Sequence, residues 1–212
     1  MSGMYSNEEY DLAGFCVGAV SRSKVLPNFS SMRSSGDILI GLRSSGLHSN
    51  GYSLVRKCVE KSGLSWSDPA PFQPELSLGE ALLCPTRIYV KSILALTKLD
   101  LVKGMAHITG GGFPENIPRM LTDELMAVVD VAWPIPPVFK WIQEVGDIST
   151  YEMMRTLNCG IGMVLLVAEE SKDQVIEILR ANGEEEEEPV LLGFTTLRPH
   201  INSPQVLIRG EF

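Results

Sequence analysis

The sequence lacks the features that mark several large classes of protein. No apolar run reaches the roughly 20 residues of a membrane-spanning helix, and the first residues show no basic segment followed by a long apolar one. We therefore expect a cytoplasmic protein with no membrane partner. Only four cysteines occur in 212 residues, far apart along the chain, so no zinc site of closely spaced thiols is predicted. We expect these thiols to be reduced and structural.

Positive charge is also scarce. The chain has 18 Lys and Arg against 26 Asp and Glu, a formal net charge of -8, and no clustered basic face. Nucleic-acid binding needs such a face, so we expect no nucleic-acid partner, although a local cationic pocket is compatible with this charge. We interpret the glutamate run at residues 184–188 as a hydrated loop instead of a metal or partner site, because adjacent carboxylates repel one another. We assign no metal ligands.

The common nucleotide-binding fingerprints are absent as well. A P-loop needs a lysine followed by Ser or Thr after its second glycine, whereas the glycines at residues 110–112 are followed by Phe and Pro. The dinucleotide pattern of spaced glycines begins at Gly160 and Gly162, but Leu165 stands where its last glycine would be. P-loop and Rossmann-type nucleotide sites are therefore not expected.

What the chain does contain is an alternation of short apolar runs and longer amphipathic ones. This alternation predicts an α+β fold, a mixed β-sheet covered by helices. With 44% hydrophobic residues the chain can bury a substantial core. We divide it into residues 1–34, which carry a strand and a turn-rich linker, and residues 35–212, which form the main α+β domain.

The periodicity also predicts the individual elements. Strands are expected at residues 13–20, 37–42, 101–109, 124–132, 160–168, 190–197 and 205–208. Helices are expected at residues 50–62, 78–83, 86–98, 113–121, 138–145, 150–157 and 171–182. Ser49 or Asn50 should cap the first helix and Gly63 should end it. The proline-rich segment 65–77 is predicted to be a surface loop.

Two loops of similar composition carry the candidate chemistry. SSGLHSNG places His48 among hydroxyls, an amide and glycines, and HITGGG places His107 before three successive glycines. Each loop lies between a predicted strand and a predicted helix, where unpaired helical N–H groups and the helix dipole attract anions. Successive glycine amides can form a concave nest around an oxyanion. We interpret the two loops as one shared phosphate-binding site.

Both loops also have a structural interpretation. A single histidine near a loop is more often a satisfied structural group than a catalyst, and glycines can simply form turns. Two loops of the same kind favour the functional interpretation over the structural one. We interpret His200 as exposed and structural, and Cys159 as a turn residue because no basic residue adjoins it in sequence.

Several segments resemble one enzyme family in the same order. These segments are GLRSSGLHSNGYSLVRK, PTRIY, AHITGGGFPENIPR and RTLNCGIGMVLLV. They resemble aminoimidazole ribonucleotide synthetase (phosphoribosylformylglycinamidine cyclo-ligase), in the form found as the middle domain of the trifunctional purine biosynthetic protein. The resemblance implies ATP-dependent ring closure of formylglycinamidine ribonucleotide to aminoimidazole ribonucleotide in purine biosynthesis, with Mg²⁺ required.

The resemblance covers only the C-terminal half of that family. It implies that ATP and Mg²⁺ are bound mainly by an N-terminal barrel half, of which residues 13–20 would be the last strand. It further implies a homodimer in the intact family, and self-association of this chain through that orphan strand. Little or no cyclo-ligase activity is expected of this chain alone.

The resemblance assigns roles within both loops. His48 and His107 would be catalytic, either donating to a developing oxyanion or moving a proton near neutral pH. The expected substrate-binding residues are Ser45, Gly46, Ser49, Asn50, Thr109, Gly110, Gly111 and Gly112. Two alternatives stay open: a non-catalytic nucleotide- or phosphate-binding module, and a relative acting on another substrate, such as the amidotransferase that supplies the amidine or a thiamine-phosphate kinase.

Overall fold

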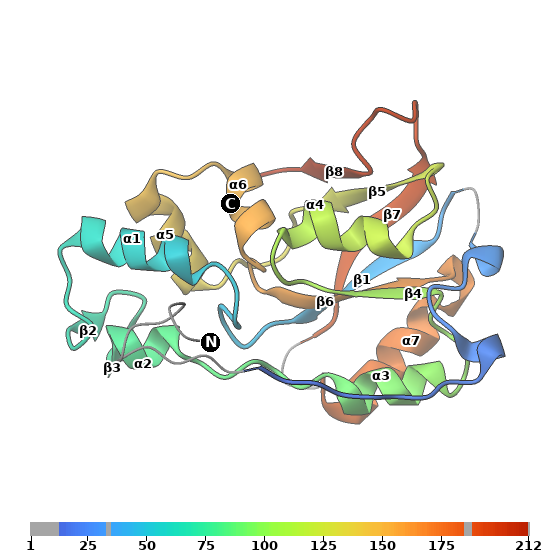
Figure 1. The fold of residues 1–212 in the computed structure, drawn as a ribbon, viewed down its shortest axis with the longest axis horizontal. Helices are drawn as coiled ribbons and strands as arrows, with labels where there is room; N and C mark the ends of the chain where they lie inside the picture. Colours follow the sequence, from blue (N-terminus) through green and yellow to red (C-terminus); the bar gives the residue numbers. More distant parts are fainter. Residues whose placement is uncertain (1–12, 33–34, 185–187, 212) are drawn as a thin grey trace, which may run out of the picture.

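A central mixed sheet organises the computed structural model, which describes residues 13–32, 35–184 and 188–211 (Figure 1). Its strands are β1 (Ile38–Arg43), β4 (Gly104–His107), β5 (Leu125–Asp130), β6 (Ile161–Val167), β7 (Val190–Leu197) and β8 (Val206–Arg209). Their order is β4-β6-β1-β7-β5-β8, and every neighbouring pair is antiparallel except β5 and β8. The predicted α+β fold with a mixed sheet is therefore confirmed.

Helices cover both faces of this sheet. The helices are α1 (Tyr52–Ser62), α2 (Leu78–Leu82), α3 (Val90–Thr97), α4 (Gly112–Asn116), α5 (Pro137–Gly146), α6 (Thr150–Thr156) and α7 (Lys172–Leu179). Side chains of α3 and α7 bury one apolar cluster against β1 and β6. Side chains of α1, α4, α5 and α6 belong to the larger cluster on the opposite face. Strands β6 and β1 each contribute buried side chains to both clusters, so this pair of strands lies between the two halves of the core.

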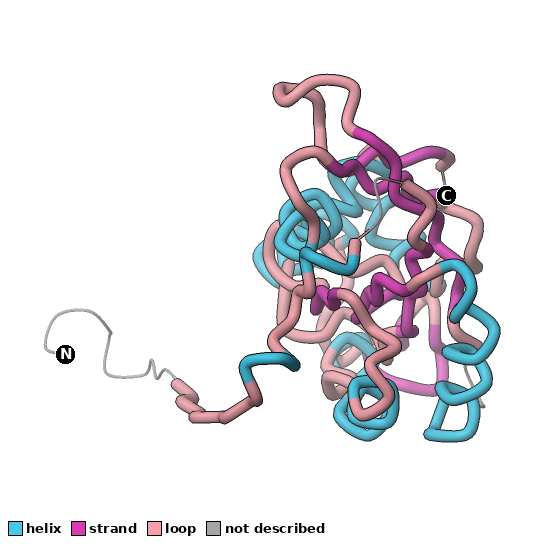
Figure 2. The backbone as a smooth tube through the Cα atoms, turned by 90° about the vertical axis from the view of Figure 1, so that its right-hand side faces the viewer, coloured by secondary structure: helices cyan, strands magenta, loops and turns pink. Residues whose placement is uncertain are grey.

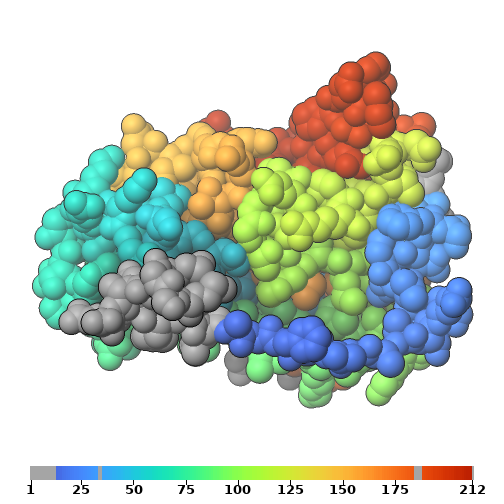
Figure 3. All heavy atoms as spheres, in the orientation of Figure 1, coloured from blue at the N-terminus to red at the C-terminus, as the bar shows by residue number. Residues whose placement is uncertain are grey.

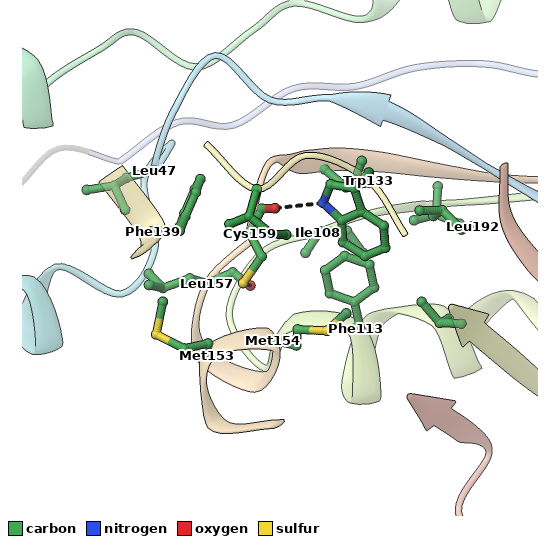
Figure 4. Packing of buried hydrophobic residues seen from close by; sticks show 14 of the residues in the cluster. Leu47, Ile108, Phe113, Trp133, Phe139, Met153, Met154, Leu157, Cys159 and Leu192 are labelled. Atoms are coloured by element: carbon green, nitrogen blue, oxygen red, sulfur yellow. Dashed lines mark hydrogen bonds between the residues drawn. The ribbon is translucent and has the colours of Figure 1, made fainter. Parts of the chain in front are cut away.

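Aromatic packing and one buried hydrogen bond order the larger cluster. The rings of Phe113 and Trp133 stack with centroids 6.0 Å apart and planes 17° apart. The Trp133 indole N–H donates to the carbonyl of Cys159 at 3.0 Å, which satisfies its polar atom inside the core (Figure 4). Cys159 is fully buried, and burial raises the pKa of its thiol. Its predicted structural role is confirmed.

The other cysteines also carry free thiols. Cys58 is buried and its pKa is raised by burial, whereas Cys16 is exposed, so the expectation of structural thiols is wrong for Cys16.

Within the part of the chain that the structure describes, no helix is long and apolar enough to cross a bilayer.

The predicted strand at residues 13–20 is wrong. This segment has no secondary structure, and Phe15 and Val17 are 94% and 84% exposed. A strand is stabilised by hydrogen bonds to a neighbouring strand, and the described sheets place none beside it. Figure 2 shows the segment leading away from the body of the fold. Residues 1–12 and 33–34 of the predicted N-terminal remnant lie outside the described residues.

After residue 20 the chain turns back onto the domain. The backbone N–H of Asn28 donates to the carbonyl of Lys103 at 2.7 Å, which ties this segment to the start of β4. A cavity of about 900 Å³ lies between it, α3 and β4, with Leu26, Leu94 and Met105 among its lining residues. In the space-filling view this segment, coloured blue, lies at the right-hand side of the face shown (Figure 3). None of the predicted site residues lines this cavity.

Three further predictions need correction. The proline-rich segment 65–77 contains a short hairpin, β2 (Pro69–Ala70) paired with β3 (Gln73–Ser77), and is therefore not only a loop. Helix α1 is preceded by Gly51 in a left-handed conformation instead of a Ser49 or Asn50 cap, although it ends at Gly63 as predicted. The expected helix 113–121 divides into α4 and a 3₁₀ helix, Ile117–Met120, because Pro118 has no N–H for a continuing α-helix.

Two other sequence expectations concern exposed positions. Ile88, expected within a helix, lies before α3 and is 82% exposed, because that helix begins only at Val90. In the glutamate run, residues 185–187 lie outside the described residues. Glu188 is exposed and accepts from Arg180 at 2.7 Å, in agreement with a hydrated surface loop.

A buried ion pair joins the beginnings of β1 and β4. Asp37 is fully buried, and its Oδ1 lies 2.6 Å from Nζ of Lys103. We expect Lys103→Met to keep the apolar stem but leave the Asp37 carboxylate buried without this cation, lowering the free energy of unfolding by about 3–5 kcal/mol in urea denaturation. The control Lys24→Met breaks an exposed pair with Asp100 and should cost under ~1 kcal/mol. Equal stability of the two variants would contradict this role for Lys103.

Candidate active site

The two glycine-rich loops meet because of the sheet topology. Strands β1 and β4 both pair antiparallel with β6, so they run in the same direction and end at the same edge of the sheet. The first loop leads from β1 to α1 and the second from β4 to α4. Their histidine rings, His48 and His107, lie with centroids 6.4 Å apart. The predicted convergence of the loops is confirmed.

Tyr89 completes a cluster of three rings. Its ring centroid lies 6.3 Å from that of His48 and 6.3 Å from that of His107. Its hydroxyl donates to the carbonyl of Arg43 at 2.7 Å, which fixes the ring at the end of β1. The guanidinium carbon of Arg87 lies 5.9 Å from the Tyr89 centroid, within reach of a cation–π interaction. The sequence patterns predict no role for Arg87 or Tyr89, although both lie in the PTRIY segment that contributes to the family resemblance.

Gly162 makes room for this cluster. A Cβ atom at this position of β6 would lie 2.0 Å from the Tyr89 hydroxyl and 2.6 Å from Cε1 of His48. Such distances are far shorter than van der Waals contact, so any side chain would displace one of the rings. The glycine that began an incomplete dinucleotide pattern therefore has a packing role.

His48 is held in an unusual conformation and environment. It is 4% exposed and has φ of 58°, in the left-handed region that is uncommon for residues other than glycine. Its Nε2 accepts from the backbone N–H of Ser45 at 3.2 Å and of Arg87 at 3.4 Å. Burial and, to a smaller extent, the charges of His107 and Arg87 together lower the pKa of His48 to about 4. The imidazole is neutral at physiological pH.

Asn158 fixes the loop that carries His48. Its Nδ2 donates to the carbonyls of Gly46 and Leu47 at 2.8 and 3.0 Å. Its Oδ1 accepts from the Ser44 hydroxyl at 2.8 Å and from the Gly160 N–H at 2.9 Å. One buried amide therefore ties the first loop to the start of β6, which goes beyond the turn role that its position in the sequence indicated.

Asn116 does the same for the second loop. Its Nδ2 donates to the carbonyls of Gly110 and Gly112 at 3.1 and 2.7 Å, and its Oδ1 accepts from the Thr109 hydroxyl at 3.1 Å. The N–H of Gly112 donates to the carbonyl of Thr109, so this amide is directed into the loop. A Cβ at Gly112 would lie 1.9 Å from the carbonyl oxygen of Met154. Gly112 is thus required for close packing against α6.

The remaining predicted residues lie around these two fixed loops. Gly110 is exposed, and a Cβ built on it would be 3.6 Å from Oδ1 of Asn50, which shows that the loops touch. Gly111, with φ of 86°, is the N-cap residue that precedes α4. The hydroxyl of Ser45 donates to the carbonyl of Pro85 at 2.6 Å, and that of Ser49 lies 3.3 Å from the Thr86 hydroxyl. The segment before α3 therefore forms a third wall.

His107 differs from His48 in its surroundings. It is exposed at the end of β4, and partial desolvation lowers its pKa below the ordinary value of 6.5. An exposed imidazole can exchange protons with a ligand or water near neutral pH. In residues 13–32, 35–184 and 188–211 no group of three or more His, Cys, Asp or Glu side chains is arranged to hold a metal ion.

We expect Gly162→Ala to disrupt the three-ring cluster. The added methyl overlaps the Tyr89 hydroxyl and the His48 ring, so the free energy of unfolding should fall by about 1–3 kcal/mol in chemical denaturation. The control is Gly18→Ala, because a Cβ at Gly18 would meet nothing within 4 Å. If both variants are equally stable, the close packing at Gly162 is not required.

Solved structures with a similar fold belong to longer chains. The hydrogenase maturation protein HypE of E. coli matches with a TM-score of 0.52 and 18% sequence identity, over 85% of this chain and 48% of that chain. T. maritima PurL complexed with AMPPCP matches with a TM-score of 0.46 and 11% identity, over 91% of this chain and 26% of that chain. The HypE likeness shows the fold. The chain spans about half the length of that protein.

A protein-family comparison covers both loops of the site. The family described as "AIR synthase related protein, C-terminal domain" matches residues 34–191 of this chain. The match runs from before β1 to the first residues of β7 and includes His48, His107, Tyr89 and Gly162. The chain belongs to this family of AIR synthase-related C-terminal domains.

Proposed function

We propose that this chain supplies the substrate-binding half of an ATP-dependent cyclo-ligase, which closes formylglycinamidine ribonucleotide to aminoimidazole ribonucleotide. One observation carries the proposal: two histidines that are 59 positions apart in the sequence, each next to a glycine-rich loop, have ring centroids 6.4 Å apart in the fold. Family membership and the four resembling segments support the choice of this reaction over others.

Binding of the ribonucleotide is proposed for the exposed rim of the site. Gly110 is exposed and Gly111 is the N-cap residue of α4, so we assign their backbone N–H groups to the phosphate, together with Ser49 and with Asn50, which lies beside Gly110. Backbone amides bind phosphate without a countercharge. We assign Ser45 and Gly46, in the first loop, to the same rim, whose shape Thr109 and Gly112 maintain through their hydrogen bonds with Asn116.

Chemistry is proposed for the two histidines. In the reaction an amidine nitrogen bonds to the formyl carbon, the bond from that carbon to the phosphorylated oxygen breaks, inorganic phosphate leaves with that oxygen, and the nitrogen loses a proton. ATP, bound with Mg²⁺ mainly by another part of the enzyme, supplies the phosphoryl group that activates the formyl oxygen. His48 and His107 lie close enough together to act on one amide, stabilising its oxygen and accepting the proton.

A second candidate uses the same loops without catalysis. Exposed Gly110 beside Asn50 would bind a phosphate or nucleotide even if no ring closure followed. The chain would then be a phosphate-binding module, and its histidines would be structural. Turnover measurements separate this candidate from the first, because only the cyclo-ligase depends on both imidazoles.

Ligand titration tests the binding step on this chain itself. We expect formylglycinamidine ribonucleotide to bind in isothermal titration calorimetry and ATP to bind much more weakly, because the proposed ATP contacts lie mainly in another part of the enzyme. Tighter binding of ATP than of the ribonucleotide would favour the second candidate. Indifference to both ligands would contradict both.

Substitution of each histidine tests the chemical step. In a full-length enzyme carrying these motifs, His48→Ala and His107→Ala should each lower kcat about 100-fold or more, measured as formation of aminoimidazole ribonucleotide. His200→Ala is the matched control, since His200 is exposed and its ring accepts from the nearby Asn202 N–H at 3.1 Å. Unchanged turnover in the first two variants would show that the assigned roles are wrong.

A further inference from the structure

The two ring nitrogens of His48 have different hydrogen-bonding roles. Nε2 faces two backbone donors, the N–H groups of Ser45 at 3.2 Å and Arg87 at 3.4 Å. A nitrogen that accepts from N–H groups cannot carry a hydrogen of its own. A neutral imidazole has one N–H, so the hydrogen of His48 must lie on Nδ1.

Nδ1 is therefore a donor, and within the described residues it has no acceptor. The atom is buried, and the whole residue is only 4% exposed. A buried donor without an acceptor is unfavourable in a folded protein, so an oxygen that reaches it gains a strong hydrogen bond. Such an atom marks a place where a ligand or an ordered water is bound.

We propose that His48 is a fixed, neutral hydrogen-bond donor that binds a carbonyl or phosphoryl oxygen of the ligand through Nδ1–H, and that His107 alone of the pair exchanges protons. The identity of the ligand rests on the function proposed above; the position of the hydrogen does not. The sequence left hydrogen-bond donation and proton exchange open for both histidines; here donation belongs to His48 and proton exchange to His107.

The groups facing His48 all favour its neutral form. Arg87, from the segment before α3, and His107, on β4, oppose a positive charge on the ring, and burial opposes it most. Tyr89 directs its hydroxyl to the Arg43 carbonyl. Gly162, on β6, has no side chain. These neighbouring groups are therefore either cationic or uncharged, and none of them stabilises a positive charge on the His48 ring.

His107 lacks these constraints. Its ring is exposed, and in the part of the chain that the structure describes no hydrogen bond holds either of its nitrogens. Both nitrogens can therefore meet a ligand or solvent. Because its ring centroid lies 6.4 Å from that of His48, one ligand group can contact both. An amide fits this arrangement, with its oxygen at His48 and its departing proton at His107.

Nitrogen-15 NMR of the histidine rings tests the proposal on the full chain, which contains only three histidines. The His107→Gln and His200→Gln variants assign the signals. In the ligand-free protein we expect His48 to show the Nδ1–H tautomer and no protonation between pH 5.5 and 8, while His107 titrates. Adding formylglycinamidine ribonucleotide without ATP should shift the Nδ1 resonance of His48.

Two results would overturn the proposal. One is an Nε2–H tautomer or a protonated His48 ring near pH 6.5. The other is binding of the ribonucleotide, seen by calorimetry, with no change at Nδ1. Absence of any binding would instead contradict the proposed function, because the tautomer is measured before ligand is added.

Two substitutions separate the ligand role of His48 from its loop role. In His48→Gln the amide oxygen can reach the former Nε2 position and accept from Ser45 and Arg87, but no donor replaces Nδ1–H. We expect an unchanged Tm and about tenfold weaker binding of the ribonucleotide. His48→Asn places a donor near Nδ1 and should retain more of the affinity. Equal affinity of His48→Gln and the unsubstituted protein would count against the donor role.

Discussion

The antiparallel pairing of β6 with both β1 and β4 is the constraint on which the rest of the site depends. It makes β1 and β4, the strands on either side of β6, parallel to each other and brings their ends to one edge of the sheet. Because β6 is buried on both faces, a shift in its register would move apolar side chains out of both core clusters. The same packing energy that stabilises the fold therefore fixes the distance between the two loops.

Buried amides transmit this fixed geometry to the histidines. Asn158 bonds the first loop to the start of β6, and Asn116 closes the second loop upon itself. Each amide uses both its donor and its acceptor atoms, so neither is left with an uncompensated polar group in the core. The result is a site in which His48 is rigid and buried while His107 stays accessible, although both stand on loops of similar sequence.

Periodicity predicted most of the elements because side-chain burial follows local sequence here. Strand β6, buried on both faces, is an uninterrupted apolar run, and the end of α1 at Gly63 follows from a left-handed turn that glycine allows. The prediction was wrong for residues 13–20, which have strand-like composition but no neighbouring strand. It also missed Gly51 before α1, since a left-handed residue can precede a helix without a side-chain cap.

By itself, the sequence determined the mixed α+β architecture, the positions of both glycine-rich loops and the resemblance that the family comparison supports in its broader form. Only the tertiary structure decided that Tyr89 packs beside both histidines, that Gly162 makes room for the rings and which nitrogen of His48 can donate. The physical reason is distance along the chain: the bond from Asn158 to Gly46 joins residues 112 positions apart. No local pattern of side chains encodes such a contact, because it exists only once the sheet has formed.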